Sequence, residues 1–135
     1  LVIAAENTDW EAHIFEIELW SGASLVSGPG LGTASDDCTR NGRLSANAFD
    51  GDASSKWETC SGNKVGKSVT YVMNSPNGVT KVKTQQWGGS GNAIPKFDLF
   101  CANATDVFYV WTADLGSGAG TNEAVSGLLP PSAAD

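Results

Sequence analysis

The chain has one histidine, three cysteines and only 17% charged residues, and each scarcity excludes a kind of site. With His13 as the only histidine, the usual Ser-His-Asp and Cys-His nucleophile arrangements are excluded. The three cysteines have no C-x-x-C spacing and no histidines clustered near them, so a zinc site is not expected. No apolar run approaches the ~20 residues of a membrane-spanning helix, so we expect no membrane insertion.

Basic residues are also outnumbered, because the formal net charge is −7 and the sequence pI is about 4.5. This charge would repel the phosphate backbone of a nucleic acid, so we expect no nucleic-acid partner. An acidic surface suits divalent cations, although acidic residues also serve solubility alone.

What the sequence does contain is turn chemistry between short alternating runs. The chain of 135 residues fits one domain, and its 16 glycines supply the backbone angles that tight turns need. Alternation predicts strands over residues 13–20, 67–74, 79–86, 96–102 and 107–113. In the first run it places Phe15, Ile17 and Leu19 on one face, opposite Glu16 and Glu18. No run keeps a helical period, so we expect an all-β antiparallel β-sandwich of the jelly-roll type.

Turn residues predict how these strands connect. Asn77-Gly78 predicts a hairpin between runs 67–74 and 79–86, and the short polar segment 102–106 predicts another between the last two runs. From Gly116 onward the composition turns to Gly, Ser, Ala and Pro. We therefore expect a domain over 1–115, with its core in about 10–115, and a tail or linker over 116–135. The first five residues are too short for a signal core, so we expect a processed or excerpted chain.

The cysteines bear on the compartment. Cys38 and Cys60 flank one loop-rich segment, and a disulfide between them would restrain it, whereas the alternative is three buried free thiols that include Cys101. Asn103 begins an N-glycosylation sequon, which matters only in a secretory-pathway host. A disulfide predicts an extracellular, cell-surface or virion-surface location.

The most specific segment is Ala46-Asn47-Ala48-Phe49-Asp50-Gly51-Asp52, followed by Ser54-Ser55 and Trp57. It resembles the pattern near the start of discoidin, or coagulation-factor type C, domains and of family 32 carbohydrate-binding modules, which have a galactose-binding-like fold. The segment 95–100, Pro-Lys-Phe-Asp-Leu-Phe, is similar to a later strand of that family. The resemblance covers about residues 10–115. It departs in one respect, because the acidic strand that often closes the family's domain comes first here, as in a permuted arrangement.

The resemblance implies a structural calcium ion. Its ligands would be Asp50, the Asp52 region, Ser55 and a glutamate of the acidic strand, with Glu16 preferred to Glu18. Ca²⁺ takes six to eight oxygen ligands, and a tight turn at Gly51 lets carboxylates and carbonyls converge. The alternative is that the two aspartates only cap the turn through the backbone, as aspartate does without metal.

Ligand contacts are expected in other loops. The resemblance places Trp57 beneath its loop, in the core, whereas Trp87 is flanked by Gly and Ser in an apparent loop that continues to Asn92. We therefore expect Trp87 and Asn92 to contact a ligand. Arg40, Asn41 and Arg43 form a second polar loop that can hydrogen-bond hydroxyl groups or simply face solvent.

These residues lead to two hypotheses of different class. The first is a non-catalytic, lectin-like carbohydrate-binding module stabilised by calcium, with a glycan or glycoprotein as its partner. The second is a structural or assembly domain of a surface appendage, virion fibre or extracellular filament, with self-association or neighbouring subunits as its contacts. An enzyme is not expected, because Glu16 and Glu18 would point side by side rather than flank a glycosidic bond.

Overall fold

Ten strands, each in an antiparallel pair, are present in the computed structural model, which describes residues 1–75, 78–102 and 105–126. They are β1 (Val2–Ala5), β2 (His13–Ser21), β3 (Ser24–Leu25), β4 (Gly32–Asp36), β5 (Trp57–Glu58), β6 (Val69–Met73), β7 (Lys81–Gln86), β8 (Lys96–Ala102), β9 (Val107–Asp114) and β10 (Gly120–Val125). Two 3-10 turns, η1 (Ser45–Ala48) and η2 (Ser90–Asn92), are the only helical segments in those ranges. Among these residues no helix has the length and apolarity needed to cross a membrane. The all-β prediction is confirmed.

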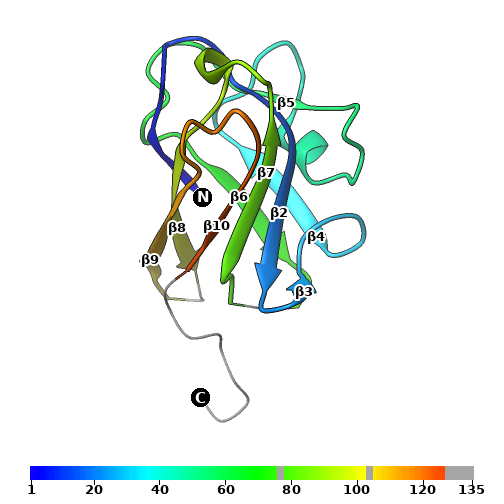
Figure 1. Cartoon of the computed structure of the whole chain (residues 1–135). Coiled ribbons are helices and arrows are strands. Elements are labelled where there is room, and N and C mark those ends of the chain that lie inside the picture. The colour runs from blue at the N-terminus through cyan, green and yellow to red at the C-terminus, as the bar shows by residue number, and fades with distance from the viewer. Residues whose placement is uncertain (76–77, 103–104, 127–135) are drawn as a thin grey trace.

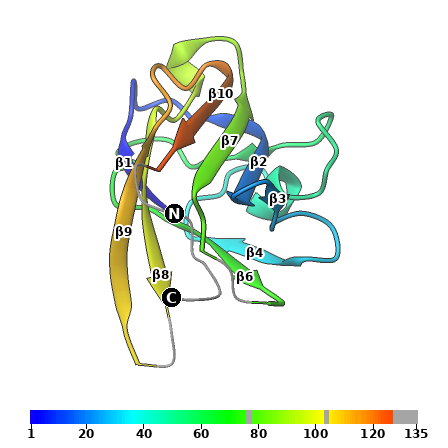
Figure 2. The same cartoon turned by 60° about the horizontal axis from the view of Figure 1, so that its bottom comes forward.

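The strands form three sheets that enclose one core (Figure 1). One sheet has the order β10-β7-β2-β3, with β5 also paired to β2; the others are β1-β8-β9 and β4-β6. The turned view separates the β8–β9 hairpin from the sheet that carries β7 and β2 (Figure 2). Ile17 and Val82 from the first sheet, Phe97 and Leu99 from the second and Val69 from the third are buried in the same cluster. The arrangement is that of an antiparallel β-sandwich.

A bulge in β2 changes which of its residues face the core. Its register with β7 shifts between Ile14 and Glu16, so Ile14, Ile17 and Leu19 are buried. Phe15, which strict alternation places in the core, instead stacks on Trp87 with ring centroids 6.4 Å apart. The predicted inward position of Phe15 is therefore wrong, because a bulge inserts one residue and reverses the alternation before it.

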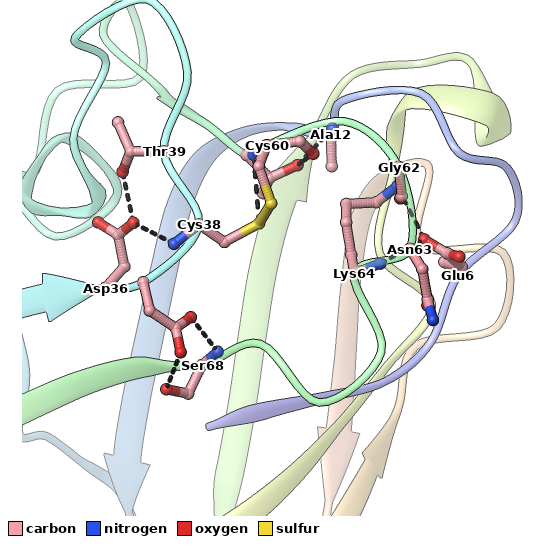
Figure 3. The surroundings of a disulfide bond; sticks show 12 residues. Glu6, Ala12, Asp36, Cys38, Thr39, Cys60, Gly62, Asn63, Lys64 and Ser68 are labelled. Carbon is pink, nitrogen blue, oxygen red and sulfur yellow. Dashed lines mark hydrogen bonds and ion pairs between the residues drawn. A yellow bond between two sulfur atoms is a disulfide. The ribbon is translucent and has the colours of Figure 1, made fainter.

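The loop that carries the family-like segment is anchored by Trp57 and a disulfide. Trp57 is fully buried and donates from Nε1 to the Cys38 carbonyl at 3.0 Å, which confirms its predicted place in the core. The Cys38–Cys60 disulfide is present, with 22 positions of sequence separation (Figure 3). Cys101, half-buried on β8, is not part of it. The expectation of one disulfide is confirmed over three free thiols.

A buried ammonium holds two further loops beside the disulfide (Figure 3). Lys64 is 1% exposed, and its Nζ donates to the carbonyls of Thr8 at 2.9 Å and Trp10 at 2.6 Å. The same Nζ lies 2.9 Å from Glu6 Oε2. Burial alone would raise the pKa of Glu6, but hydrogen bonds from Lys64 outweigh it and lower that pKa. Every hydrogen of the ammonium thus finds an oxygen, which is what a buried charge requires.

The predicted connections are half right. All five predicted strands exist within a few residues of their expected bounds, and β8 pairs with β9 as the predicted hairpin. The other predicted hairpin is wrong, because β6 pairs with β4 whereas β7 lies between β2 and β10. Asn77 itself lies outside the described residues. A turn signal reports a local reversal of the chain, but it does not show that the flanking strands pair.

The predicted tail begins too early. Leu115 is buried in the core, and β10 pairs with β7 along its whole length, from Gly120 opposite Gln86 to Val125 opposite Lys81. The sequence of β10, Gly-Thr-Asn-Glu-Ala-Val, buries little apolar surface, so it lacks the alternation that marks the other strands. The part of the predicted tail from 127 to 135 lies outside the described residues. β1 likewise extends the folded part to the first residues of the chain.

Candidate functional site

A row of polar and aromatic side chains crosses the outer face of the β7-β2-β5 sheet. Because Ile14 and Trp57 face the core, the residues paired beside them, His13 on β2 and Glu58 on β5, point to the other face. Trp87 follows β7 and donates its backbone N–H to the His13 carbonyl at 2.9 Å. The rings of His13 and Trp87 lie 5.8 Å apart. Three strands thus bring together residues that are far apart in the sequence.

The two arginines of the chain flank a tight turn beside this row. Asn41 and Gly42 both have positive φ, 57° and 65°, and Arg43 N–H donates to the Arg40 carbonyl at 3.2 Å. These are the features of a type I′ turn, for which Asn-Gly is the favoured sequence. Glu58 bonds the turn through its backbone, accepting from Arg40 at 2.9 Å and donating to Arg43 at 3.0 Å. Residues that flank such a turn project to the same side, so both guanidinium groups lie next to the row.

Carboxylates hold both guanidinium groups in place. Arg40 Nη1 lies 3.0 Å from Glu11 Oε2, and Arg43 Nε lies 3.2 Å from Glu58 Oε2. The amide of Asn41 donates to the other Glu58 oxygen at 2.9 Å. The arginine side chains remain 45% and 53% exposed, whereas the Glu58 side chain is only 6% exposed. The carboxylates therefore orient the arginines from below and leave much of each guanidinium facing solvent.

The protonation of His13 is set by Lys56. Lys56 Nζ lies 2.6 Å from His13 Nδ1, and since an ammonium only donates, Nδ1 accepts and the ring proton is on Nε2. Burial, and then the charge of Lys56, lower the pKa of His13, which keeps the ring neutral. Nε2 faces Glu11 Oε1 at 3.8 Å. A hydrogen-bond donor and an acceptor therefore stand side by side next to the Trp87 ring.

Ligand atoms of Glu11, His13 and Glu58 lie within 4.8 Å of one another, which is close enough to consider a metal ion. A metal would need the Nε2 lone pair, which Lys56 makes unavailable by fixing the proton there. It would also compete with two arginines for the carboxylates. The arrangement favours hydrogen bonding to a ligand over holding an ion.

The predicted ligand residues divide into two groups. Trp87 is 50% exposed and contacts the His13 ring, and the two exposed arginines pair with Glu11 and Glu58, which both lie beside His13. Asn41 bonds Glu58, and Asn92 uses its amide to donate to the Glu11 carbonyl at 2.8 Å. These two asparagines therefore position other residues of the site.

Sequence reasoning did not find Glu11, His13, Lys56 or Glu58 as site residues. His13 entered the sequence analysis only as the single histidine of the chain, with no role in a site, and no local pattern marks the two glutamates or the lysine. The signal that finds them is the strand register, His13 opposite Glu58, which joins segments 45 positions apart. Alternation alone gives the face of a residue, not its neighbour on the next strand.

The predicted calcium ligands form a second cluster, here called the corner, in the loop that follows η1 along the chain. Ser55 Oγ contacts three oxygen acceptors: a carboxylate oxygen of Asp50, the Asp52 carbonyl at 3.0 Å and the Asn47 carbonyl at 3.5 Å. A hydroxyl has one proton to donate, so it cannot satisfy all three. Gly51 has φ 73°, the left-handed angle that the tight turn between the aspartates requires.

Both aspartates of this corner also cap the backbone. Asp50 Oδ1 accepts from the Asp52 N–H, and Asp52 Oδ1 accepts from the Ser54 N–H, each at 2.9 Å. The Asp52 carboxylate is turned toward Ser54, which lowers its pKa, so only its carbonyl points to the Ser55 hydroxyl. The turn-capping interactions expected as the alternative are thus present alongside the converging oxygens.

Glu16, rather than Glu18, approaches this corner. Burial, and then the adjacent Asp50 carboxyl, raise the pKa of Glu16 to about 8. Within the described ranges its Oε1 is buried and has no hydrogen-bond partner. Glu18 instead accepts from Trp20 Nε1 at 3.1 Å. Two carboxyl groups in contact need a proton or a cation between them, because both are acceptors when ionised.

The sequon residue Asn103 lies outside the described residues. No model of a protein family matches the chain, and neither curated proteins nor solved structures give a match.

Proposed function

We propose that this domain is a non-catalytic, extracellular carbohydrate-binding module of the discoidin-like type. The observation that carries the proposal is the half-exposed Trp87 ring beside a fixed donor and acceptor, His13 Nε2–H and the Glu11 carboxylate. A partly exposed aromatic ring with a few placed polar groups is what a small-molecule site needs for apolar contact and orientation. The Cys38–Cys60 disulfide is compatible with an extracellular location.

The chemistry of the site matches a sugar. The C–H face of a pyranose ring packs on an indole ring, while its hydroxyl groups both accept and donate hydrogen bonds. A hydroxyl placed between His13 and Glu11 would accept from Nε2–H and donate to the carboxylate. Glycan or glycoprotein partners follow from this chemistry, and no catalytic step is part of the proposal.

A structural calcium ion is the second part of the proposal. Glu16, Asp50, Ser55 and the carbonyls of Asn47 and Asp52 would supply oxygen ligands of the kind that Ca²⁺ prefers. A cation at this corner is supported by Glu16 Oε1, which is buried without a hydrogen-bond partner, and by the Ser55 hydroxyl, which faces more acceptors than its one proton can satisfy. The ion would fix the loop and make no contact with the sugar.

A glycan array tests the first part. We expect selective binding by the native domain and a loss of at least roughly fivefold in affinity for Trp87→Ala, since stacking on an aromatic ring contributes about 1 kcal/mol or more. Tyr109→Ala is the matched control, because Tyr109 on β9 is 54% exposed but belongs to the other sheet. Equal binding by Trp87→Ala and native protein would reject the site, and binding to no glycan would reject the function.

The second candidate function is a structural or assembly role, which one surface favours. The end of the β8–β9 hairpin at which β8 leads into β9 exposes four apolar side chains, Phe100, Val107, Phe108 and Tyr109, at 40% to 72%. Apolar groups gathered this way often mark protein contacts. Light scattering over a range of concentrations separates the two candidates: growth in mass without glycan binding supports assembly, and a constant monomer mass opposes it.

A further inference from the structure

The charge of the binding site is opposite to the charge of the molecule. The chain carries −7 in total, yet Lys56 contacts His13, and both of its arginines pair with the two carboxylates that lie beside His13. Against these three cations stand the two carboxylates of Glu11 and Glu58, and His13 is neutral. The site is therefore locally positive on an acidic protein.

The arginines are held in a way that suits an anion. Arg40 and Arg43 flank the two-residue turn on the same side, and each ion pair uses one nitrogen, Nη1 of Arg40 and Nε of Arg43. A guanidinium has five N–H groups in a planar fork, so further donors of each arginine remain for a ligand. Pre-oriented guanidinium groups recognise carboxylate and sulfate oxygens with directed, charge-assisted hydrogen bonds.

A neutral sugar needs no charge from the two arginines. Its hydroxyl groups are served by His13 Nε2–H, which Lys56 fixes, by the Glu11 carboxylate and by the Trp87 ring. Two oriented arginines beyond these groups add electrostatic attraction that only an anionic ligand uses.

We infer that the site binds an anionic carbohydrate, with Trp87 under the sugar ring and a carboxylate or sulfate group between Arg40 and Arg43. The inference rests on the proposed carbohydrate-binding function and names its ligand class. The ring substituent and the two guanidinium groups supply the specificity, and Glu11 and Glu58 act as positioning residues that keep the guanidinium groups oriented.

The test is an array of uronic-acid, sulfated and neutral oligosaccharides, followed by calorimetric titration of the best binder and of its carboxyl-reduced or desulfated counterpart. We expect the anionic form to bind at least roughly tenfold more tightly and to weaken as salt is raised. Preference for uronic acids identifies a carboxylate, and preference for sulfated sugars identifies a sulfate.

Variants separate the two levels of the proposal. Arg40→Gln and Arg43→Gln should remove the preference for the anionic form. The lysine variants Arg40→Lys and Arg43→Lys should lose less of this preference. Lys67→Gln is the control, because it makes an equal charge change on an exposed loop residue and should keep the preference. Because Arg43 pairs with buried Glu58, Arg40→Gln, whose partner is more exposed, remains informative if Arg43→Gln fails to fold. Equal affinity for anionic and neutral forms overturns the inference and leaves the function standing. Binding to no glycan at all overturns both.

Discussion

Neutralising Glu16 should stabilise the metal-free protein and remove its response to calcium. Between its ordinary pKa of 4.5 and its folded value of about 8, the folded state keeps a proton on Glu16 that the unfolded state releases. Stability contributed by this group is therefore present at low pH and lost as pH rises through that window. Above pH 8 the ionised carboxyl carries the cost of burying its charge and faces Asp50, and Glu16→Gln removes both penalties.

The size of the effect follows from the raised pKa, reduced for solvent contact. One pKa unit corresponds to about 1.4 kcal/mol, but Glu16 is partly open to water, which screens its interaction with Asp50. We therefore expect the free energy of unfolding of metal-free Glu16→Gln to exceed that of the native protein by roughly 1 to 2 kcal/mol near pH 8.5. Near pH 5 the two free energies should differ little.

Calcium should reverse the order of the two proteins. The ion binds the ionised carboxyl, so it stabilises the native domain increasingly as pH rises, by about 2.7 kcal/mol at a hundredfold excess over its dissociation constant. Glu16→Gln lacks one charged ligand and should gain much less. Glu18→Gln is the matched control from the same strand, and it should keep the native calcium response because Glu18 bonds Trp20 instead.

The assay is urea unfolding from about pH 5 to about pH 9, in chelator and in excess calcium. Two results would refute the reasoning. If metal-free stability does not fall with pH relative to Glu16→Gln, the contact with Asp50 is not repulsive. If calcium leaves the native midpoint unchanged and calorimetry shows no heat, the corner is a capped turn without a metal, as the aspartate hydrogen bonds alone would allow.

Two further predictions concern the loops that carry the site. Replacing Cys38 and Cys60 by serine should lower the free energy of unfolding by about 3 kcal/mol, because the unfolded chain regains the entropy that a closed loop of 22 positions removes. Urea unfolding measures this loss beside the Cys101→Ser control, and equal stability of both variants would contradict the prediction. Lys64→Met should lower the free energy of unfolding by roughly 3 kcal/mol, since it leaves buried carbonyls without a donor and the Glu6 carboxylate without its cation. Lys67→Met is the exposed control, and a loss for Lys64→Met no larger than that of the control would contradict the structural role.

The sequence predicted those strands in which buried apolar residues alternate with exposed ones. β8 was found with its bounds because Phe97 and Leu99 face the core in strict alternation. β10 was missed because Ala124 is its one buried apolar residue, so its place in the sheet comes from backbone pairing with β7. Backbone hydrogen bonding does not depend on side-chain type and leaves no trace in the composition.

The candidate site was predictable in part, and the division follows the same physics. Trp87 and the arginines were found because glycine and asparagine mark the loops that expose them. His13 and Glu58 could not be found, because their meeting depends on the pairing of β2 with β5 and on the bulge that turns Phe15 outward. Such long-range register is decided by the whole core and not by either segment.

The corner formed by Glu16, Asp50 and Ser55 and the row that contains His13 share two short segments of chain, which would give the corner a role in the proposed function. Strand β2 carries His13 into the row and Glu16 into the corner, with the bulge between them. On the other side, Ser55 belongs to the corner and the next residue, Lys56, sets the protonation of His13. A cation at the corner would therefore fix the backbone on both sides of the His13–Lys56 contact. In the proposed function the aspartates would affect glycan binding through the position of the imidazole, since no hydrogen bond joins them to the row within the described residues.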